Sequence, residues 1–191
     1  MTIGLYFGSF NPIHIGHMAI ANYMVEYGGL DQLWFVVSPH NPLKEKKSLL
    51  KDYHRLEMVR LAIEGDDRLR ASDIEFRLPR PSYTIDTLTY LEEKHPGTEF
   101  RLIMGADGLK TFHKWKHADL IAEKYHRLIY PRPGVDLSFP SPLPNATVVD
   151  APQMDISSSF IRKAIRQGKD IRHLMPADAY RYMREMHFYE K

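Results

Sequence analysis

The feature that most constrains this chain is residues 4–17, Gly-Leu-Tyr-Phe-Gly-Ser-Phe-Asn-Pro-Ile-His-Ile-Gly-His. Residues 3–7 are an apolar run with the length of a buried strand, and residues 8–12 then supply turn formers. From Met18 onward, apolar residues recur at helical spacing until Gly28 and Gly29 end the pattern. The sequence therefore predicts a strand, a glycine-containing turn and a helix.

Two histidines, His14 and His17, stand at the predicted start of that helix. In an open α/β sheet this is the carboxyl edge of the strands, where ligands bind. A helix N-terminus offers unpaired N–H groups and a partial positive charge, which suit a phosphate. Gly16 lets a bulky group approach the backbone between the two histidines. Either histidine alone is compatible with an ordinary turn, but the joint pattern predicts an anion site.

The pattern Gly-Ser-Phe-x-Pro-x-His-x-Gly-His resembles the signature of the nucleotidyltransferase superfamily that is related to class I aminoacyl-tRNA synthetases. Residues 14–17 spell the HIGH tetrapeptide of that superfamily. The resemblance implies that His14 and His17 stabilise the α-phosphate of a nucleoside triphosphate while a second substrate attacks it.

Composition sets broad limits on the chain. Its 191 residues suffice for one α/β domain with a small appended part, and 43% hydrophobic with 26% charged residues are typical of globular proteins. The net charge of +2 does not indicate a general nucleic-acid binder, and the lack of cysteine excludes disulfides and thiolate chemistry. Neither a membrane span nor a signal peptide is recognisable, so we expect a cytoplasmic protein without a membrane partner. The sequence leaves the oligomeric state open, a homo-oligomer included.

The rest of the chain alternates strand and helix patterns. Further strands are expected at residues 33–37, 69–76, 100–104, 126–130 and 147–149, and further helices at 52–63, from 82 or 84 to about 95, from 157 to 168, and at 176–188. This alternation predicts a Rossmann-like, doubly wound, mostly parallel sheet in a single domain over residues 1–191, with a small C-terminal helical part at about 157–191.

Three stretches between these elements carry candidate site residues. Residues 39–47 combine two prolines with three lysines, typical of a surface loop, and Lys44 could reach a phosphate from it. Asp107 follows a strand at the binding edge, where it would accept ribose hydroxyls or only cap the next helix. Trp115 by itself favours a core or partly buried position, as a lone tryptophan usually has.

The second signature is residues 156–162, Ile-Ser-Ser-Ser-Phe-Ile-Arg. Its serines can cap a helix, which places Arg162 near the first helical turn. A guanidinium beside a helix N-terminus suits a diphosphate or triphosphate. Taken alone, this pattern favours an ordinary capped helix.

Both signatures, together with Ser-Tyr-Thr-x-Asp-Thr-Leu at residues 82–88 and Gly-Ala-Asp at 105–107, resemble the nicotinate-nucleotide adenylyltransferases over nearly the whole length. Asn11 stands where that family more often has aspartate, and Ser159 where threonine is usual; both keep their hydrogen-bonding ability. The resemblance implies transfer of the adenylyl group of ATP to nicotinate mononucleotide, which gives deamido-NAD and pyrophosphate.

The resemblance also implies roles for individual residues. His14, His17 and Arg162 would be catalytic; ATP would contact Gly8, Ser9, Phe10, Gly16, Gly105, Asp107, Ile156, Ser157 and Ser158; nicotinate mononucleotide would contact Lys44, Thr84, Trp115 and Arg132. Mg²⁺ is expected to arrive with ATP and not to have a protein cage of its own, because no carboxylate cluster is visible in the sequence.

Alternatives remain at this point. Another small nucleotidyltransferase, such as the phosphopantetheine adenylyltransferase, shares the first signature, although residues 82–88 and Trp115 argue against it. A class I aminoacyl-tRNA synthetase would need a lysine-rich second signature and a longer chain. A nucleotide-binding regulator without catalysis is the alternative from another functional class.

Overall fold

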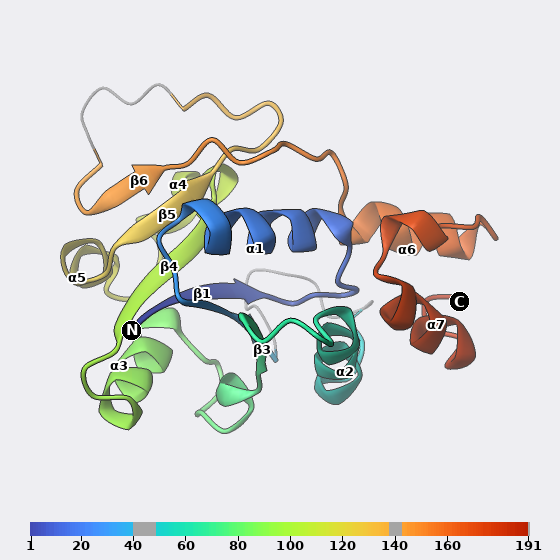
Figure 1. Ribbon diagram of the computed structural model, residues 1–191, viewed down its shortest axis with the longest axis horizontal. Coiled ribbons are helices and arrows are strands. Elements are labelled where there is room, and N and C mark those ends of the chain that lie inside the picture. Colours follow the sequence, from blue (N-terminus) through green and yellow to red (C-terminus); the bar gives the residue numbers. More distant parts are fainter. Residues whose placement is uncertain (40–48, 138–142, 191) are drawn as a thin grey trace.

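A six-stranded parallel sheet forms the centre of the protein (Figure 1). The structure is a computed structural model that describes residues 1–39, 49–137 and 143–190. The strands are β1 (Thr2–Gly8), β2 (Gln32–Val37), β3 (Leu69–Ser72), β4 (Glu99–Gly105), β5 (Arg127–Tyr130) and β6 (Ala146–Val148). The helices are α1 (Ile15–Tyr27), α2 (Asp52–Ala62), α3 (Thr84–Lys94), α4 (Ala106–Phe112), α5 (Ala118–Lys124), α6 (Ser158–Arg166) and α7 (Ala177–Glu185), with short 3-10 turns η2 (Ile74–Phe76) and η3 (Arg172–Leu174).

The strand order β3-β2-β1-β4-β5-β6 reverses its direction of growth between β1 and β4. Every strand pair is parallel, with Leu5 opposite Trp34 on one side and opposite Leu102 on the other. This order defines the doubly wound fold and places a crevice at the carboxyl ends of β1 and β4. The predicted Rossmann-like fold is confirmed, and the sheet is parallel throughout the described residues, beyond the mostly parallel sheet expected.

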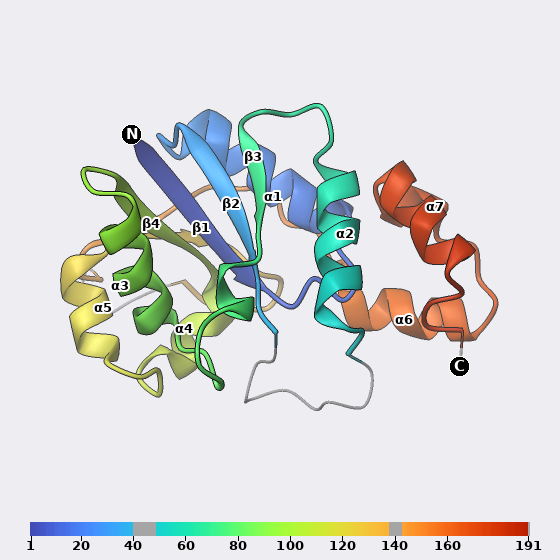
Figure 2. The same ribbon diagram turned by 90° about the horizontal axis from the view of Figure 1, so that it is seen from below.

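Both faces of the sheet are covered by helices. Successive residues of a strand point to opposite faces, so Ile3 and Leu5 of β1 pack with α3 and α5, whereas Tyr6 packs with α1 and α2. Figure 2 shows α3 and α5 together on their side of the sheet, and Figure 1 shows α6 and α7 at the end of the molecule where β1 ends and α1 begins. The C-terminal helices therefore lie beside the binding edge.

Two expectations about element boundaries are wrong. The strand expected at residues 69–76 ends at Ser72, because local hydrogen bonds to the Ser72 hydroxyl and the Asp73 carbonyl start the turn η2 instead. The last helix stops at Glu185, before His187 and Tyr189 adopt positive φ angles of 54° and 65°.

Within the described residues, none of the helices is long and apolar enough to cross a bilayer.

A buried arginine connects the loops at the carboxyl edge. The Arg55 side chain on α2 is fully buried, and its guanidinium donates to the carbonyl oxygens of Ser9 at 2.5 Å and Ser38 at 2.8 Å. It also donates to Leu50 O at 3.0 Å and to the Asp52 carboxylate at 2.7 Å. One cation thus holds the β1–α1 turn, the end of β2 and the start of α2 together.

Replacing Arg55 should therefore destabilise the whole fold. Arg55→Met leaves several buried carbonyl groups without their donor and removes one of the two arginine partners of the Asp52 carboxylate, so we expect the free energy of unfolding to fall by about 3–5 kcal/mol. Arg60→Met, on the exposed side of the same helix, is the matched control and should change it by less than about 0.5 kcal/mol. Urea denaturation followed by circular dichroism measures both. Equal effects of the two substitutions would contradict the connecting role of Arg55.

Candidate active site

A cavity of ≈ 660 Å³ opens at the carboxyl ends of β1 and β4. This size is within the usual range for small-molecule sites. Fourteen of the sixteen residues that the sequence singled out line it: Gly8, Ser9, Phe10, His14, Gly16, His17, Gly105, Asp107, Trp115, Arg132, Ile156, Ser157, Ser158 and Arg162. Of the other two, Thr84 is not part of the wall, and Lys44 lies outside the described residues. The two signatures, far apart in sequence, therefore meet in one site.

The turn between β1 and α1 forms the floor of this cavity. Phe10 has a φ of 42°, an unfavourable angle for a residue with a side chain. Its ring is buried and packs edge-on against Tyr6 and Phe35, at centroid distances of 5.7 and 5.3 Å. A Cβ atom at Gly8 would lie 2.8 Å from the Phe10 ring, so this packing requires glycine there. The predicted turn is thus held by aromatic packing from the core.

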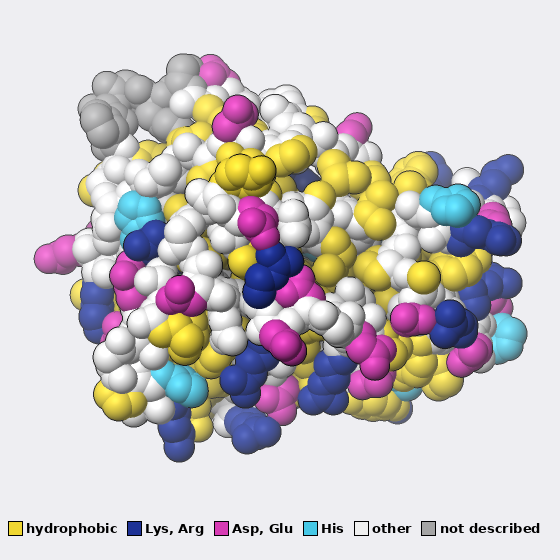
Figure 3. Space-filling model, viewed as in Figure 1, with side chains coloured by type: hydrophobic (Ala, Val, Ile, Leu, Met, Phe, Trp, Pro, Cys, Tyr) yellow, Lys and Arg dark blue, Asp and Glu magenta, His cyan; other side chains and the backbone are white. Residues whose placement is uncertain are grey.

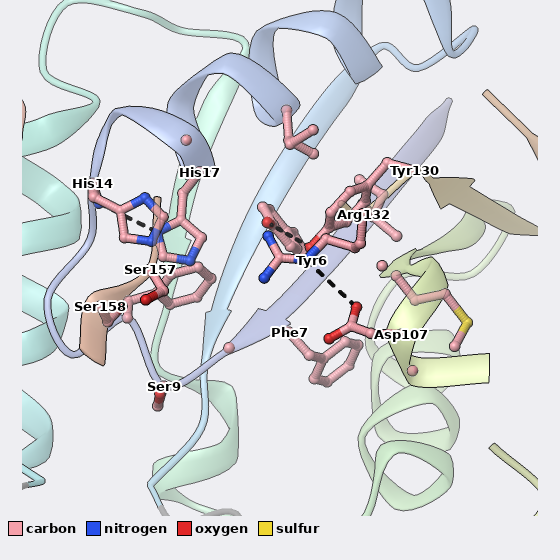
Figure 4. A pocket seen from close by; sticks show the side chains of 18 of the residues that line it. Tyr6, Phe7, Ser9, His14, His17, Asp107, Tyr130, Arg132, Ser157 and Ser158 are labelled. Carbon is pink, nitrogen blue, oxygen red and sulfur yellow. Dashed lines mark hydrogen bonds and ion pairs between the residues drawn. The ribbon is translucent and has the colours of Figure 1, made fainter. Parts of the chain in front are cut away.

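The two histidines lie against each other at the start of α1 (Figure 4). Their rings are stacked at a centroid distance of 3.7 Å, and the His14 backbone N–H donates to His17 Nδ1 at 3.2 Å. A Cβ atom at Gly16 would lie 3.0 Å from His14 Nδ1, so glycine makes room for the His14 ring. The space that Gly16 leaves beside the helix backbone is therefore occupied by the His14 side chain.

His14 is almost fully buried, with 4% of its surface exposed. Burial, and secondly the positive charge of Arg132, lower the pKa of His14 from 6.5 to about 4. The imidazole is therefore neutral at physiological pH. Among the described residues its buried Nδ1 atom has no hydrogen-bond partner.

The start of α6 forms the wall beside the histidines, and Figure 4 shows Ser157 and Ser158 next to His14 and His17. Ser157 caps the helix by accepting from Phe160 N at 3.1 Å, as the sequence predicts. The Ser158 hydroxyl donates to the Pro12 carbonyl oxygen at 2.8 Å, which joins α6 to the β1–α1 turn. Two helix N-termini therefore converge on the same cavity, and both favour an anion.

Arg162 extends from α6 to the edge of that turn. Its Nη1 donates to the Asn11 carbonyl oxygen at 2.8 Å and its Nη2 to the Ser159 hydroxyl at 3.2 Å. Both partners are neutral, so the guanidinium charge is not cancelled by them. Burial lowers the pKa of Arg162, although an arginine remains charged at any physiological pH. The side chain is a cation available to an anion in the cavity.

The opposite wall comes from β4, α4 and β5. Asp107 lies in the first turn of α4, where Gly105 is the N-cap, so Asp107 does not cap the helix with its side chain. Its carboxylate is 3.6 Å from Arg132 Nε, and a dashed line in Figure 4 marks this ion pair. Beneath this pair the hydroxyls of Tyr6 and Tyr130 lie 3.1 Å apart, both buried. Burial, the largest cause in both cases, raises the pKa of Tyr6 and of Tyr130, so both hydroxyls remain protonated and one donates to the other.

Trp115 and the start of α3 lie close together at one end of the cavity. Trp115 lines the cavity and packs against Phe112 at a centroid distance of 5.4 Å. Its neighbour Lys116 donates to both Asp86 oxygens at 3.0 Å and lies 4.8 Å from the Tyr83 ring. The segment that carries Trp115 is thereby held against the first turn of α3.

Thr84 lies at the start of a helix, as expected, but it is not part of the cavity wall. It is the first residue of α3, Tyr83 is the N-cap, and neither Ser82 nor Thr84 caps the helix with its side chain. The Ser82 hydroxyl instead interacts with the buried Glu75 carboxyl group, to which Thr87 also donates at 2.9 Å. This buried acceptor draws the serine away from the helix start.

Sequence reasoning missed several residues of the site. Tyr6 and Tyr130 were assigned only to strands, and Asn11 only to the turn, yet all three line the cavity. A tyrosine within an apolar strand that ends at the binding edge is the signal that could have indicated them.

Across the face in Figure 3, basic and acidic side chains are interspersed, in line with the balanced net charge. The described residues contain no group of three or more His, Asp or Glu side chains placed to hold a metal ion.

Comparison with known proteins places these features in context. A family described as cytidylyltransferase-like matches residues 5–164. A protein of Flavobacterium johnsoniae, described as a probable nicotinate-nucleotide adenylyltransferase, is 50% identical over 196 residues that span 100% of both chains. A Bacteroides fragilis protein with the same description is 49% identical, over 93% of this chain and 89% of the other.

Among solved structures, the Plasmodium falciparum nicotinic acid mononucleotide adenylyltransferase complexed with NaAD superposes with a TM-score of 0.82. The alignment covers 99% of this chain and 97% of the other at 20% identity. At that identity the likeness establishes a shared fold.

The buried His14 should make the stability of the protein depend on pH. The unfolded chain takes up a proton at a pKa of about 6.5, whereas folded His14 does so at about 4. Stability is therefore fully present above pH 6.5 and falls, by up to about 3 kcal/mol, as the pH drops toward 4. His14→Gln should flatten this dependence, and His113→Gln, at an exposed position, should retain it. Urea midpoints between pH 4 and 7.5 measure the slope; an unchanged slope in His14→Gln would contradict the buried neutral state.

Proposed function

The chain belongs to the nicotinate-nucleotide adenylyltransferase family, within the cytidylyltransferase-like proteins, and from this membership we propose that it transfers the adenylyl group of ATP to nicotinate mononucleotide. The products are deamido-NAD and pyrophosphate, so the reaction belongs to NAD biosynthesis. The observation that carries the proposal is the convergence of His14, His17 and Arg162, from two helix starts, on a cavity at the carboxyl edge of the sheet.

ATP would lie along the floor between the two signatures. Gly8, Ser9, Phe10 and Gly16 would present backbone groups to the nucleotide, and Ile156, 3.9 Å from the Cβ position of Gly16, would close this side. On the opposite wall, Gly105 permits close approach, and Asp107 would accept hydroxyl hydrogen bonds from the ribose. His14 and His17 would then contact the α- and β-phosphates.

The chemistry needs no general base, because the phosphate of the mononucleotide is already ionised. One of its oxygens attacks the α-phosphorus of ATP, a new P–O bond forms, and the bond to the β-phosphate oxygen breaks as pyrophosphate leaves. Catalysis then consists of positioning and of stabilising negative charge. In this arrangement His14 and His17 would stabilise the negative charge on the α-phosphate. Ser158 and Arg162 serve the leaving pyrophosphate, with backbone N–H groups at the start of α6 beside them.

Mg²⁺ would enter this site with ATP. Magnesium in nucleotide enzymes is bound largely through substrate phosphates and few carboxylates, and Asp107 is a carboxylate on the wall of the cavity. The bound ion would neutralise charge on the triphosphate. The residues of the cavity fit this arrangement, in which phosphate oxygens and water supply most of the ligands.

Nicotinate mononucleotide would occupy the end of the cavity near Trp115. The indole ring would stack on the pyridine ring, and Thr84, at the start of α3, would turn helix N–H groups toward its carboxylate. The contacts of Lys116 with Asp86 and Tyr83 support this pairing, since they hold the Trp115 segment against α3. Arg132 would meet the phosphate from the cavity wall, and Lys44 is assigned to the same substrate from the loop outside the described residues.

The proposal predicts a preference for the acid over the amide form of the mononucleotide. The neutral amide loses the attraction of the carboxylate to the helix N-terminus, and its NH₂ group can place a donor opposite a backbone donor. Together these two effects give a preference of roughly tenfold to several hundredfold in kcat/KM. A pyrophosphate-release assay with Mg-ATP should compare nicotinate mononucleotide, nicotinamide mononucleotide and phosphopantetheine. Trp115→Ala should impair both pyridine substrates alike, because stacking does not distinguish them.

Each outcome of this panel discriminates between functions. Turnover of phosphopantetheine alone would identify another adenylyltransferase, and binding of ATP without pyrophosphate release would indicate a regulator. Equal values for the two pyridine nucleotides would contradict the placement of the carboxylate at Thr84.

The role of Arg162 can be tested without changing its charge. Lysine is a point charge and cannot make two parallel hydrogen bonds to phosphate oxygens, so Arg162→Lys should lower kcat by roughly tenfold to a hundredfold. Arg166→Lys, one turn further along α6 and exposed, is the control and should remain within about twofold of wild type, as surface substitutions usually do. Steady-state pyrophosphate release measures both. Wild-type kinetics of Arg162→Lys would identify Arg162 as an ordinary surface residue.

A further inference from the structure

The C-terminal segment that follows α7 reaches the turn that carries the two histidines. The Tyr189 hydroxyl donates to the Asn11 side-chain oxygen Oδ1 at 2.7 Å, although the two residues are 178 positions apart. Burial raises the pKa of Tyr189, so its hydroxyl retains the proton and acts as a donor. Asn11 is itself buried and lines the cavity.

Asn11 connects Tyr189 to the phosphate side of the cavity. Its Oδ1 also accepts from Leu50 N at 3.2 Å, and its backbone carbonyl accepts from Arg162 Nη1 at 2.8 Å. The side chain of Asn11 therefore fixes the peptide group that holds the guanidinium. A shift of Asn11 would move Arg162, and it would also move the backbone that leads to His14.

The path of the C-terminal segment indicates that this contact is specified by the fold. Tyr189 has a φ of 65° and His187 a φ of 54°, conformations that persist only where surrounding contacts enforce them. Glu190 supplies such contacts by accepting from Arg184 at 3.2 Å and from His187 at 3.0 Å. The turn directs the tyrosine side chain back toward the cavity.

We propose that Tyr189 is a positioning residue of the active site, which holds Asn11 and through it sets the place of the Arg162 guanidinium for pyrophosphate. The proposal rests on the proposed function in one respect, the assignment of Arg162 to pyrophosphate. Tyr189 lies outside both signatures and does not itself line the cavity. It acts through Asn11.

The test compares two tyrosines of the same C-terminal region. Tyr189→Phe removes the hydroxyl bonded to Asn11, and Tyr182→Phe removes a hydroxyl 2.8 Å from His54 Nδ1, between α7 and α2 and away from the cavity. The primary readout is the affinity for inorganic pyrophosphate by isothermal titration calorimetry, with kcat and KM as further readouts. We expect Tyr189→Phe to weaken pyrophosphate binding by about threefold to tenfold, the effect of one hydrogen bond, and Tyr182→Phe to stay within twofold.

A double-substitution cycle separates positioning from general destabilisation. In an Asn11→Ala background, Tyr189→Phe should have no further effect on pyrophosphate affinity, because the acceptor through which Tyr189 acts is already gone. Additive effects, or equal losses in Tyr189→Phe and Tyr182→Phe, would overturn the proposal, and so would a wild-type protein that binds no pyrophosphate. A wild type that binds pyrophosphate but turns over no mononucleotide would refute the proposed function alone, since the affinity comparison would still decide the role of Tyr189.

Discussion

The Arg55 guanidinium is the interaction on which the geometry of the binding edge depends. It is fully buried, and it holds carbonyl groups of Ser9 and Ser38 that belong to the loops after two adjacent strands. Loop carbonyl groups at a sheet edge are costly to bury unless a donor reaches them. A charged donor with five N–H groups can satisfy several at once. The floor of the cavity is therefore fixed from behind by a residue that no substrate is expected to touch.

The parallel sheet explains why the two signatures meet. All strands end at the same edge, and the order reverses between β1 and β4, so the crevice lies where their following segments separate. The start of α1 fills one side of that crevice with His14 and His17. The start of α6, fixed by the Ser158 contact with the Pro12 carbonyl, fills the space beside it. The N-termini of α1 and α6 therefore both face the same cavity. Neither sequence pattern by itself indicates this arrangement.

Local patterns account for what could be predicted from the sequence, and long-range contacts account for what could not. The strand-turn-helix at the start, the Ser157 cap and the parallel sheet follow from apolar spacing and turn residues within short windows. Arg55 is a charged residue on the buried face of α2, beside Met58 and Val59, so its burial depends on carbonyl groups that other segments supply. The contact of Tyr189 with Asn11 spans almost the whole chain and leaves no periodic signal. The start of α3 at Thr84 agrees with the sequence pattern, but the pattern does not reveal that the Ser82 hydroxyl interacts with the buried Glu75 and leaves the helix without a side-chain cap.

The hydrogen-bond partners of Arg55 and Arg162 distinguish a charge that is balanced within the protein from one that neutral groups hold. Arg55 pairs with the Asp52 carboxylate, so its charge is balanced inside the protein. Arg162 is held by a carbonyl group and a hydroxyl, which orient the guanidinium without neutralising it. Burial and, secondly, the positive charge of Arg132 disfavour a protonated His14, so the lowered pKa of that histidine keeps its imidazole neutral. The negative charge of a triphosphate would reverse this balance, because an anion close to an imidazole favours its protonated form. With the proposed substrate ATP, binding of the triphosphate would therefore raise the pKa of His14.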